Sequence, residues 1–277
     1  MFSQKPGAIG IFDTGYGGLT IFEKIAQLLP KYDYIYLGDN ARTPYGTRSF
    51  DVVYEFTLQS VRKLFEMGCH LVVLACNTAS AKALRSIQQK DLPEMDANRR
   101  VLGIIRPTVE ALGCLAHTPR HIGILGTAGT IQSGSYTLEI RKLFPGIQVT
   151  GEACPMWVPL VENNEYNSAG ADFFIRKNID NLLHSDPKID TIILACTHYP
   201  ILLEKIKKFV KPDINIVAQG DIIAHSLQKY LQKQPIIEAK CAKNGKRSFY
   251  TTEEEQKFAE SASVFLKSEI SAERIAL

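Results

Sequence analysis

The sequence predicts an α/β fold of two pseudo-symmetric domains, each with a largely parallel sheet flanked by helices, and a candidate site in the cleft between them. Two near copies of one pattern indicate this fold. An apolar strand runs into Leu-Ala-Cys and a small polar residue in LVVLACNTASA (residues 71–81), and again in IILACTHYP (residues 192–200). Such continuous apolar runs are typical of strands buried on both faces of a parallel sheet. Strand and helix patterns also alternate along the chain, which indicates right-handed βαβ units.

The repeat extends beyond these two stretches. The motif IGIF begins at Ile9 and IGIL begins at Ile122, and the same separation relates Gly38 in YLGDN to Gly151 in VTGEA. Matches in the same order along a chain are the signature of an internal repeat. We infer two related halves, each of which presents one cysteine at the end of a strand.

The predicted first domain comprises residues 1–98, with residues 218–277 returning to it, and the second comprises residues 99–217. The polar segment KDLPEMDANRR (residues 90–100) is the expected crossing between them. We expect the segment SFYTT and a helix over residues 253–267 to pack on the first domain. Strands are expected at residues 8–12, 34–37, 71–75, 101–105, 122–125, 147–150, 191–195 and 215–219.

Composition favours a protein that binds small molecules over a dedicated nucleic-acid-binding protein. The 277 residues carry 32 basic and 29 acidic side chains, a net charge of only +3, without a dominant basic face. No run of about 18 apolar residues and no apolar segment typical of a signal peptide is found. We therefore expect a cytoplasmic protein with no membrane partner and no dedicated nucleic-acid binding.

The six cysteines are expected to be free thiols. They are widely spaced, no CxxC or clustered Cys/His pattern suggests a metal site, and a chain of this size needs no disulfide staples. Cys69, Cys114 and Cys241 are interpreted as small apolar side chains. We expect no metal.

The polar residues that follow the predicted strands form the candidate site, because parallel α/β sheets bind ligands outside the carboxyl ends of their strands. Taken singly, each has a simpler interpretation: Asn77 and Thr78 as helix caps, Tyr45 as a packed aromatic, His198 as an ordinary histidine. The turns DTGYGG and GTAGT expose N–H groups that suit any anion, but neither is a phosphate-binding motif. The candidate residues are Asp13, Thr14, Tyr45, Gly46, Cys76, Asn77, Thr78, Thr127, Thr130, Cys154, Glu162, Cys196, Thr197 and His198.

Two thiols that face one ligand from opposite sides suit inversion at a carbon atom, since one removes a proton and the other supplies one. A thiol has a reference pKa of ~8.5, so the attacking member must be held as the thiolate. Asp13 on one side, and Glu162 or His198 on the other, would stabilise or shuttle its proton. The cleft must also exclude water and stabilise the developing carbanion with N–H and hydroxyl donors.

Several motifs in the same order resemble those of bacterial glutamate racemases of the aspartate/glutamate racemase superfamily. They are FDTGYGGL, LGDNARTPYG, LACNTASA, IGILGTAGT, CPMWVPLVE and ILACTHYP, over roughly residues 8–200, and SFYTT followed by a helix is similar to the C-terminal end of the family. Thr14 stands where serine is usual, Tyr16 replaces a small aliphatic residue, and Glu253 and Glu254 replace a frequent Gly-Asp.

The resemblance implies an isomerase: a cofactor-independent, two-base racemase that interconverts L-glutamate and D-glutamate and supplies D-glutamate for peptidoglycan, cell-wall biogenesis and cell shape. It implies that Cys76 acts on the D-isomer and Cys196 on the L-isomer, with Asp13, Glu162 and His198 as helpers, and that the protein is a homodimer. The implied substrate-binding residues are Asp13, Thr14, Tyr45, Gly46, Asn77, Thr78, Thr127, Thr130, Thr197 and His198.

Other functions stay open at this level. A relative acting on aspartate or another amino acid would share the motifs, and a decarboxylase would need only one thiol. A binding or regulatory role, such as inhibition of DNA gyrase, gains no support from the near-neutral charge. A redox or metal protein is disfavoured by the cysteine spacing. A disulfide between Cys76 and Cys196 would exclude the racemase.

Overall fold

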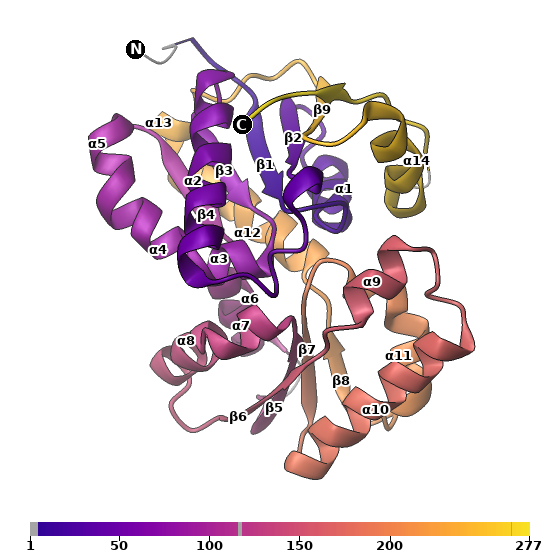
Figure 1. The fold of residues 1–277 in the computed structure, drawn as a ribbon. Helices are drawn as coiled ribbons and strands as arrows, with labels where there is room; N and C mark the ends of the chain where they lie inside the picture. Colours follow the sequence, from indigo (N-terminus) through magenta and orange to yellow (C-terminus); the bar gives the residue numbers. More distant parts are fainter. Residues whose placement is uncertain (1–4, 116–117, 267) are drawn as a thin grey trace.

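The computed structural model describes residues 5–115, 118–266 and 268–277, which form two parallel sheets flanked by helices (Figure 1). The first sheet has the strand order β10-β9-β2-β1-β3-β4 and the second the order β6-β5-β7-β8. The predicted fold class is confirmed. The strands are β1 (Ile9–Asp13), β2 (Tyr34–Gly38), β3 (Leu71–Leu74), β4 (Arg100–Gly103), β5 (His121–Gly126), β6 (Gln148–Ala153), β7 (Thr191–Ala195), β8 (Asn215–Val217), β9 (Arg247–Thr251) and β10 (Glu273–Arg274).

Helices connect the strands and cover the sheets, as Figure 1 shows. Short 3₁₀ or π turns lie at Asn40–Arg42, Ile87–Asp91, Leu112–Cys114 and Tyr199–Leu202. The α-helices are α1 (Leu19–Leu28), α2 (Phe50–Glu66), α3 (Asn77–Lys82), α4 (Leu84–Ser86), α5 (Leu92–Asp96), α6 (Ile105–Ala111), α7 (Ala128–Gln132), α8 (Ser135–Leu143), α9 (Trp157–Glu162), α10 (Ala169–Ser185), α11 (Leu203–Phe209), α12 (Gly220–Lys233), α13 (Pro235–Glu238) and α14 (Glu255–Leu266).

The sequence repeat corresponds to equivalent places in the two sheets. The order β2-β1-β3-β4 in one sheet matches β6-β5-β7-β8 in the other, so Ile9 in β1 and Ile122 in β5 lie in corresponding strands. Cys76 follows β3 and Cys196 follows β7, which are again counterparts. Strands β3 and β7 are fully buried, because helices cover both faces of a parallel sheet. Each cysteine therefore follows a buried strand at the corresponding position of its sheet.

One strand was assigned to the wrong half. The strand expected at residues 101–105 is β4, and it pairs with β3 in the first sheet, in a register that sets Val101 opposite Val72. A crossover through α3, α4 and α5 returns the chain to the same sheet, where buried Val101 joins the apolar cluster of β3. The polar segment 90–100 thus leads into a strand of the first sheet. The division into domains at residues 98 and 217 stays a prediction.

The C-terminal segment packs on the first half, where the yellow ribbon lies beside the indigo strands in Figure 1. Strand β9 pairs with β2, and buried Phe258 on α14 lies 5.5 Å from the ring of Tyr16 and 6.3 Å from that of Tyr36. Tyr16 is only 6% exposed and also stacks on Phe265, so this departure from the family pattern contacts the tail helix. The last residue of the expected helix, Lys267, lies outside the described residues.

We expect Phe258→Ala to lower the free energy of unfolding by about 3–5 kcal/mol, because it removes a fully buried ring from between the tail and the first sheet. Denaturant titration would measure the loss. Phe50→Ala is the control, since Phe50 is 50% exposed and should cost less than about 1 kcal/mol. Equal losses in the two variants would contradict this packing.

Candidate active site

The turns that follow β1 and β7 are in direct contact, which brings the two halves together at the carboxyl ends of their central strands. The hydroxyl of Thr197 donates to Oδ2 of Asp13 at 3.3 Å, and the hydroxyl of Thr20 donates to the carbonyl of Thr197 at 3.0 Å. A Cβ atom on Gly17 would lie 2.4 Å from Nδ1 of His198. Only glycine at position 17 permits this approach.

Cys76 lies on the first-half side of this contact. The residue caps α3, and its sulfur accepts the N–H of Ala79 at 3.4 Å and the hydroxyl of Thr14 at 3.6 Å. Burial raises the pKa of the Cys76 thiol to about 12, and the charges of Asp13 and Cys196 add to this shift, while the Ala79 and Thr14 hydrogen bonds oppose it. In the free protein near neutral pH, Cys76 is therefore a thiol.

Asp13 lies beside Cys76 and is fully buried. Burial raises the pKa of the Asp13 carboxyl, against the opposing charge of His198 and the N–H groups of Gly15 and Gly18. The N–H of Gly15 donates to Oδ1 at 2.9 Å and fixes the carboxyl orientation. A carboxyl with a raised pKa exchanges protons with a thiol more readily than an ordinary aspartate does.

Cys196 lies on the second-half side, with His198 and Glu162. The sulfur of Cys196 is 3.9 Å from Nδ1 of His198, and Nε2 of His198 is 3.0 Å from Oε1 of Glu162. Burial lowers the pKa of His198, but the hydrogen bonds to Cys196 and Glu162 outweigh it and raise the pKa to about 10. The imidazolium therefore donates to a carboxylate on one side and to sulfur on the other.

A second contact between the halves is made by hydroxyl groups. The hydroxyl oxygen of Thr78 is 2.9 Å from that of Thr127 and 3.2 Å from that of Thr130. The N–H of Gly129 donates to the carbonyl of Gly46 at 2.8 Å. Thr127 caps α7 through its side chain, so its hydroxyl is held in place. The structure thus brings Gly46, Thr78, Thr127 and Thr130 together.

The side chains of Asn77 and Tyr45 are committed to other protein groups. Asn77 donates to Gln219 at 2.7 Å and accepts from the hydroxyl of Tyr136 at 2.6 Å. The hydroxyl of Tyr45 donates to buried Asp39, and the ring lies 6.5 Å from that of Phe12. These two side chains hold the site together, so any contact with a ligand falls to their backbone atoms.

The sequence analysis did not predict that Gln219 and Asp39 support the site. Gln219 follows β8, so the rule of strand carboxyl ends could have found it; its amide also donates to Thr108 and Tyr136, each at 2.8 Å. Asp39 accepts from Arg42 at 2.7 Å as well as from Tyr45. Cys154 is buried, with its thiol directed to the carbonyl of Glu152, outside the paired-thiol arrangement.

The cysteines described are all free, so no disulfide joins Cys76 to Cys196. Within the described ranges, no group of three or more His, Cys, Asp and Glu side chains is arranged to hold a metal ion. Nor does any helix of the described residues have the length and apolarity that a membrane crossing requires.

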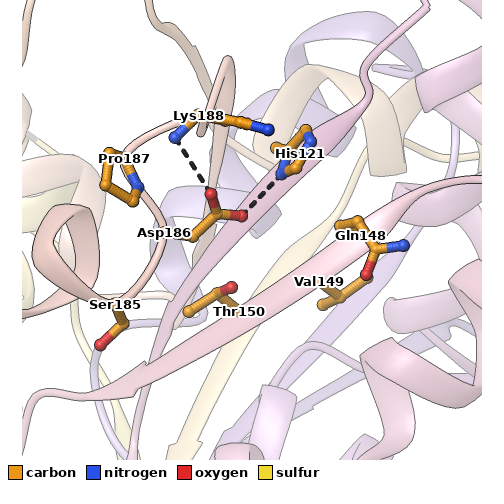
Figure 2. Close-up of a pocket in the computed structure, with 8 residues that line it drawn as sticks. All are labelled: His121, Gln148, Val149, Thr150, Ser185, Asp186, Pro187 and Lys188. Carbon is orange, nitrogen blue, oxygen red and sulfur yellow. Dashed lines mark hydrogen bonds and ion pairs between the residues drawn. The ribbon is translucent and has the colours of Figure 1, made fainter.

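A cavity of about 470 Å³ is lined by a different set of residues, which Figure 2 draws. His121 and Gln148 begin β5 and β6, so this cavity is at the amino-terminal edge of the second sheet, opposite the cysteines. Asp186 accepts from Nδ1 of His121 at 2.7 Å and from the N–H of Lys188 at 3.0 Å. The lining residues are His121, Gln148, Val149, Thr150, Ser185, Asp186, Pro187 and Lys188.

Comparison with known proteins identifies the family. Residues 9–227, which include both cysteine sites, match the Asp/Glu/Hydantoin racemase family. The chain belongs to this family. It is similar to the glutamate racemase of Ruegeria sp. strain TM1040, with 35% identity over 96% of this chain and 99% of the relative. The predicted resemblance is confirmed, and the chain is an isomerase of the amino-acid racemase class.

Two solved structures share the fold over nearly their whole length. A glutamate racemase isoform from Bacillus anthracis superimposes with a TM-score of 0.89 at 34% identity, covering 99% of each chain. The glutamate racemase from Francisella tularensis, solved in complex with D-glutamate, gives a TM-score of 0.86 at 30% identity and 98% coverage of each chain.

We expect Glu162→Gln to lower the pKa of His198, because it removes a charged acceptor from Nε2. NMR titration of the imidazole would measure the change. A histidine whose folded pKa exceeds its unfolded value stabilises the fold fully below the unfolded pKa of ~6.5, and this contribution is lost as the pH rises through about 10.

The stability difference between wild type and Glu162→Gln should therefore be largest near pH 6 and shrink toward pH 10. Glu165→Gln, at an exposed neighbouring position, is the control and should leave the His198 titration unchanged. A difference that grows with rising pH would contradict the protonated His198–Glu162 pair.

Proposed function

We propose that this protein is a glutamate racemase that interconverts L-glutamate and D-glutamate without a cofactor, with Cys76 and Cys196 as the two bases. One observation carries the proposal: counterpart strands of the two sheets each end in a buried free cysteine, and the turns beside these cysteines touch through Thr197 and Asp13. Each thiol can then address one face of an α-carbon. The names of the relatives support glutamate as the substrate.

The two sides would carry different proton partners. On the Cys76 side, Asp13 has a raised pKa and accepts the thiol proton when the ligand enters. On the Cys196 side, the His198 imidazolium stabilises negative charge on sulfur, and Glu162 holds the imidazolium in place. We assign Cys76 to the proton of the D-isomer and Cys196 to that of the L-isomer.

Thiolate formation needs help from the ligand, because burial holds the pKa of Cys76 at about 12. The ammonium group of an amino acid brings a positive charge into this buried space, where it would favour the thiolate. The hydroxyl of Thr14 and the N–H of Ala79 already point at the Cys76 sulfur. Backbone N–H groups and the hydroxyl of Thr197 would stabilise charge on the α-carboxylate as the proton leaves.

The location, assembly and metabolic role are proposed from the family resemblance. We propose that the protein acts in the cytoplasm as a homodimer and supplies D-glutamate for peptidoglycan. Ligand contacts are proposed for Asp13, Thr14, Thr78, Thr127, Thr130, Thr197 and His198 through side chains or backbone, and for Tyr45, Gly46 and Asn77 through backbone atoms.

Circular dichroism of purified protein with L-glutamate, and separately with D-glutamate, would test the proposal without added cofactor. We expect the signal to decay to zero from both sides, and Cys76→Ala or Cys196→Ala to slow the decay by roughly 10²–10⁴-fold. Cys241→Ala, at a buried thiol remote from this contact, is the control for cysteine loss. Racemisation that survives loss of either Cys76 or Cys196 would exclude the two-thiol mechanism.

Deuterium exchange at the α-carbon distinguishes the roles of the two thiols. In deuterated water, residual exchange in Cys76→Ala should enter L-glutamate without inversion, because Cys196 can remove and return a proton only on its own face. Cys196→Ala should show the mirror-image preference for D-glutamate. Mass spectrometry of each enantiomer would measure this, and equal exchange of both enantiomers in both variants would refute the face assignment.

A further inference from the structure

A buried lysine that the two-thiol chemistry does not use lies behind the site. Lys82 ends α3, the helix that begins directly after Cys76, and the residue is only 9% exposed. Its Nζ donates to the carbonyl of Arg48 at 2.7 Å. A Cβ atom on Gly129 would lie 3.0 Å from this Nζ and 2.9 Å from the carbonyl oxygen of Gly46. The ammonium thus borders both the Gly46 loop and the start of α7.

No carboxylate neutralises this charge within the part of the chain that the structure describes. Among the described residues, no ion pair within 4.0 Å includes Lys82. By contrast, the buried charge of His198 is paired with the carboxylate of Glu162. Burial lowers the pKa of Lys82, which is the expected effect on an ammonium that has lost water and gained no counter-charge. A buried charge without a partner is costly to maintain.

Lys82 and the hydroxyl cluster are connected through α3. Lys82 is four residues after Thr78, so the two side chains share a face of the helix, and helical side chains lean toward the N-terminus. Thr78 contacts Thr127 and Thr130, and α3 packs against α7. The unneutralised charge therefore lies behind Gly46 and these three threonines.

We propose that Lys82 is a specificity-determining residue whose charge selects amino acids with a second, distal carboxylate. The inference rests on the proposed function, in which the α-ammonium and α-carboxylate of glutamate compensate each other and leave one negative charge. That charge, placed at Gly46 and the threonine hydroxyls, would supply the counter-charge that the protein lacks. An uncharged side-chain amide would supply none.

The test compares affinities for D-glutamate and D-glutamine, measured by titration calorimetry. Lys82→Gln keeps a donor for the Arg48 carbonyl but removes the charge. We expect it to weaken D-glutamate binding by ~10–100-fold, the size of a charged interaction, and to leave D-glutamine binding nearly unchanged. Arg85→Gln, an exposed position on the adjoining turn with the same charge change, should alter neither affinity.

Lys82→Met provides a second uncharged variant of similar length, and thermal unfolding of both variants would check that they fold. Replacing an unpaired buried charge by an apolar side chain need not destabilise the protein. Equal weakening of both ligands would mean that Lys82 only supports the Arg48 loop, and would overturn the inference. An unchanged preference for D-glutamate would overturn it as well.

Racemisation by the wild type is measured in parallel. A wild type that racemises glutamate, with Lys82 variants that keep the full preference for D-glutamate, would refute this inference and leave the proposed function standing. A wild type inert toward glutamate would refute the proposed function, and this inference with it.

Discussion

The contact between the β1 turn and the β7 turn is the constraint on which the site depends. Thr197 reaches the carboxyl of Asp13, and Gly17 leaves room for His198, so the ends of two central strands from different sheets occupy one buried place. A side chain at position 17 would collide with the side chains of His198 and Thr197, which would have to shift. Without this contact, Cys76 and Cys196 would each end a strand but share no ligand.

The environments of the two thiols differ although their strands correspond. Cys76 is surrounded by a buried carboxyl and neutral donors, and its pKa is raised to about 12. Cys196 is beside the His198 imidazolium, which the hydrogen bonds to Cys196 and Glu162 keep protonated. The fold therefore supplies symmetric positions while the neighbouring side chains supply asymmetric charge. Such a site can treat two mirror-image ligands with different groups and still reach the same intermediate.

Local patterns in the sequence were sufficient to predict the strands and the positions of the two cysteines at strand ends. Both are visible as an apolar run followed by a polar turn. Local patterns did not predict which sheet a strand joins, because this depends on contacts between distant parts of the chain. Nothing local assigns β4 to the first sheet, since its partner β3 is reached only through a crossover. The commitment of Tyr45 to Asp39, and the roles of Gln219 and Lys82, depend on side chains that meet only in the folded chain. The clustering of Asp13, Thr197 and His198 was within reach because each lies at the carboxyl end of a central strand of its own sheet.

The most direct test of the opposed thiols is a crystal structure of the protein with D-glutamate bound. We expect the α-carbon to lie between the sulfur atoms of Cys76 and Cys196, each about 3–4 Å away and on opposite faces, which is the distance at which proton transfer can begin. A ligand that meets only one of the two sulfurs, or meets both on the same face, would contradict the account.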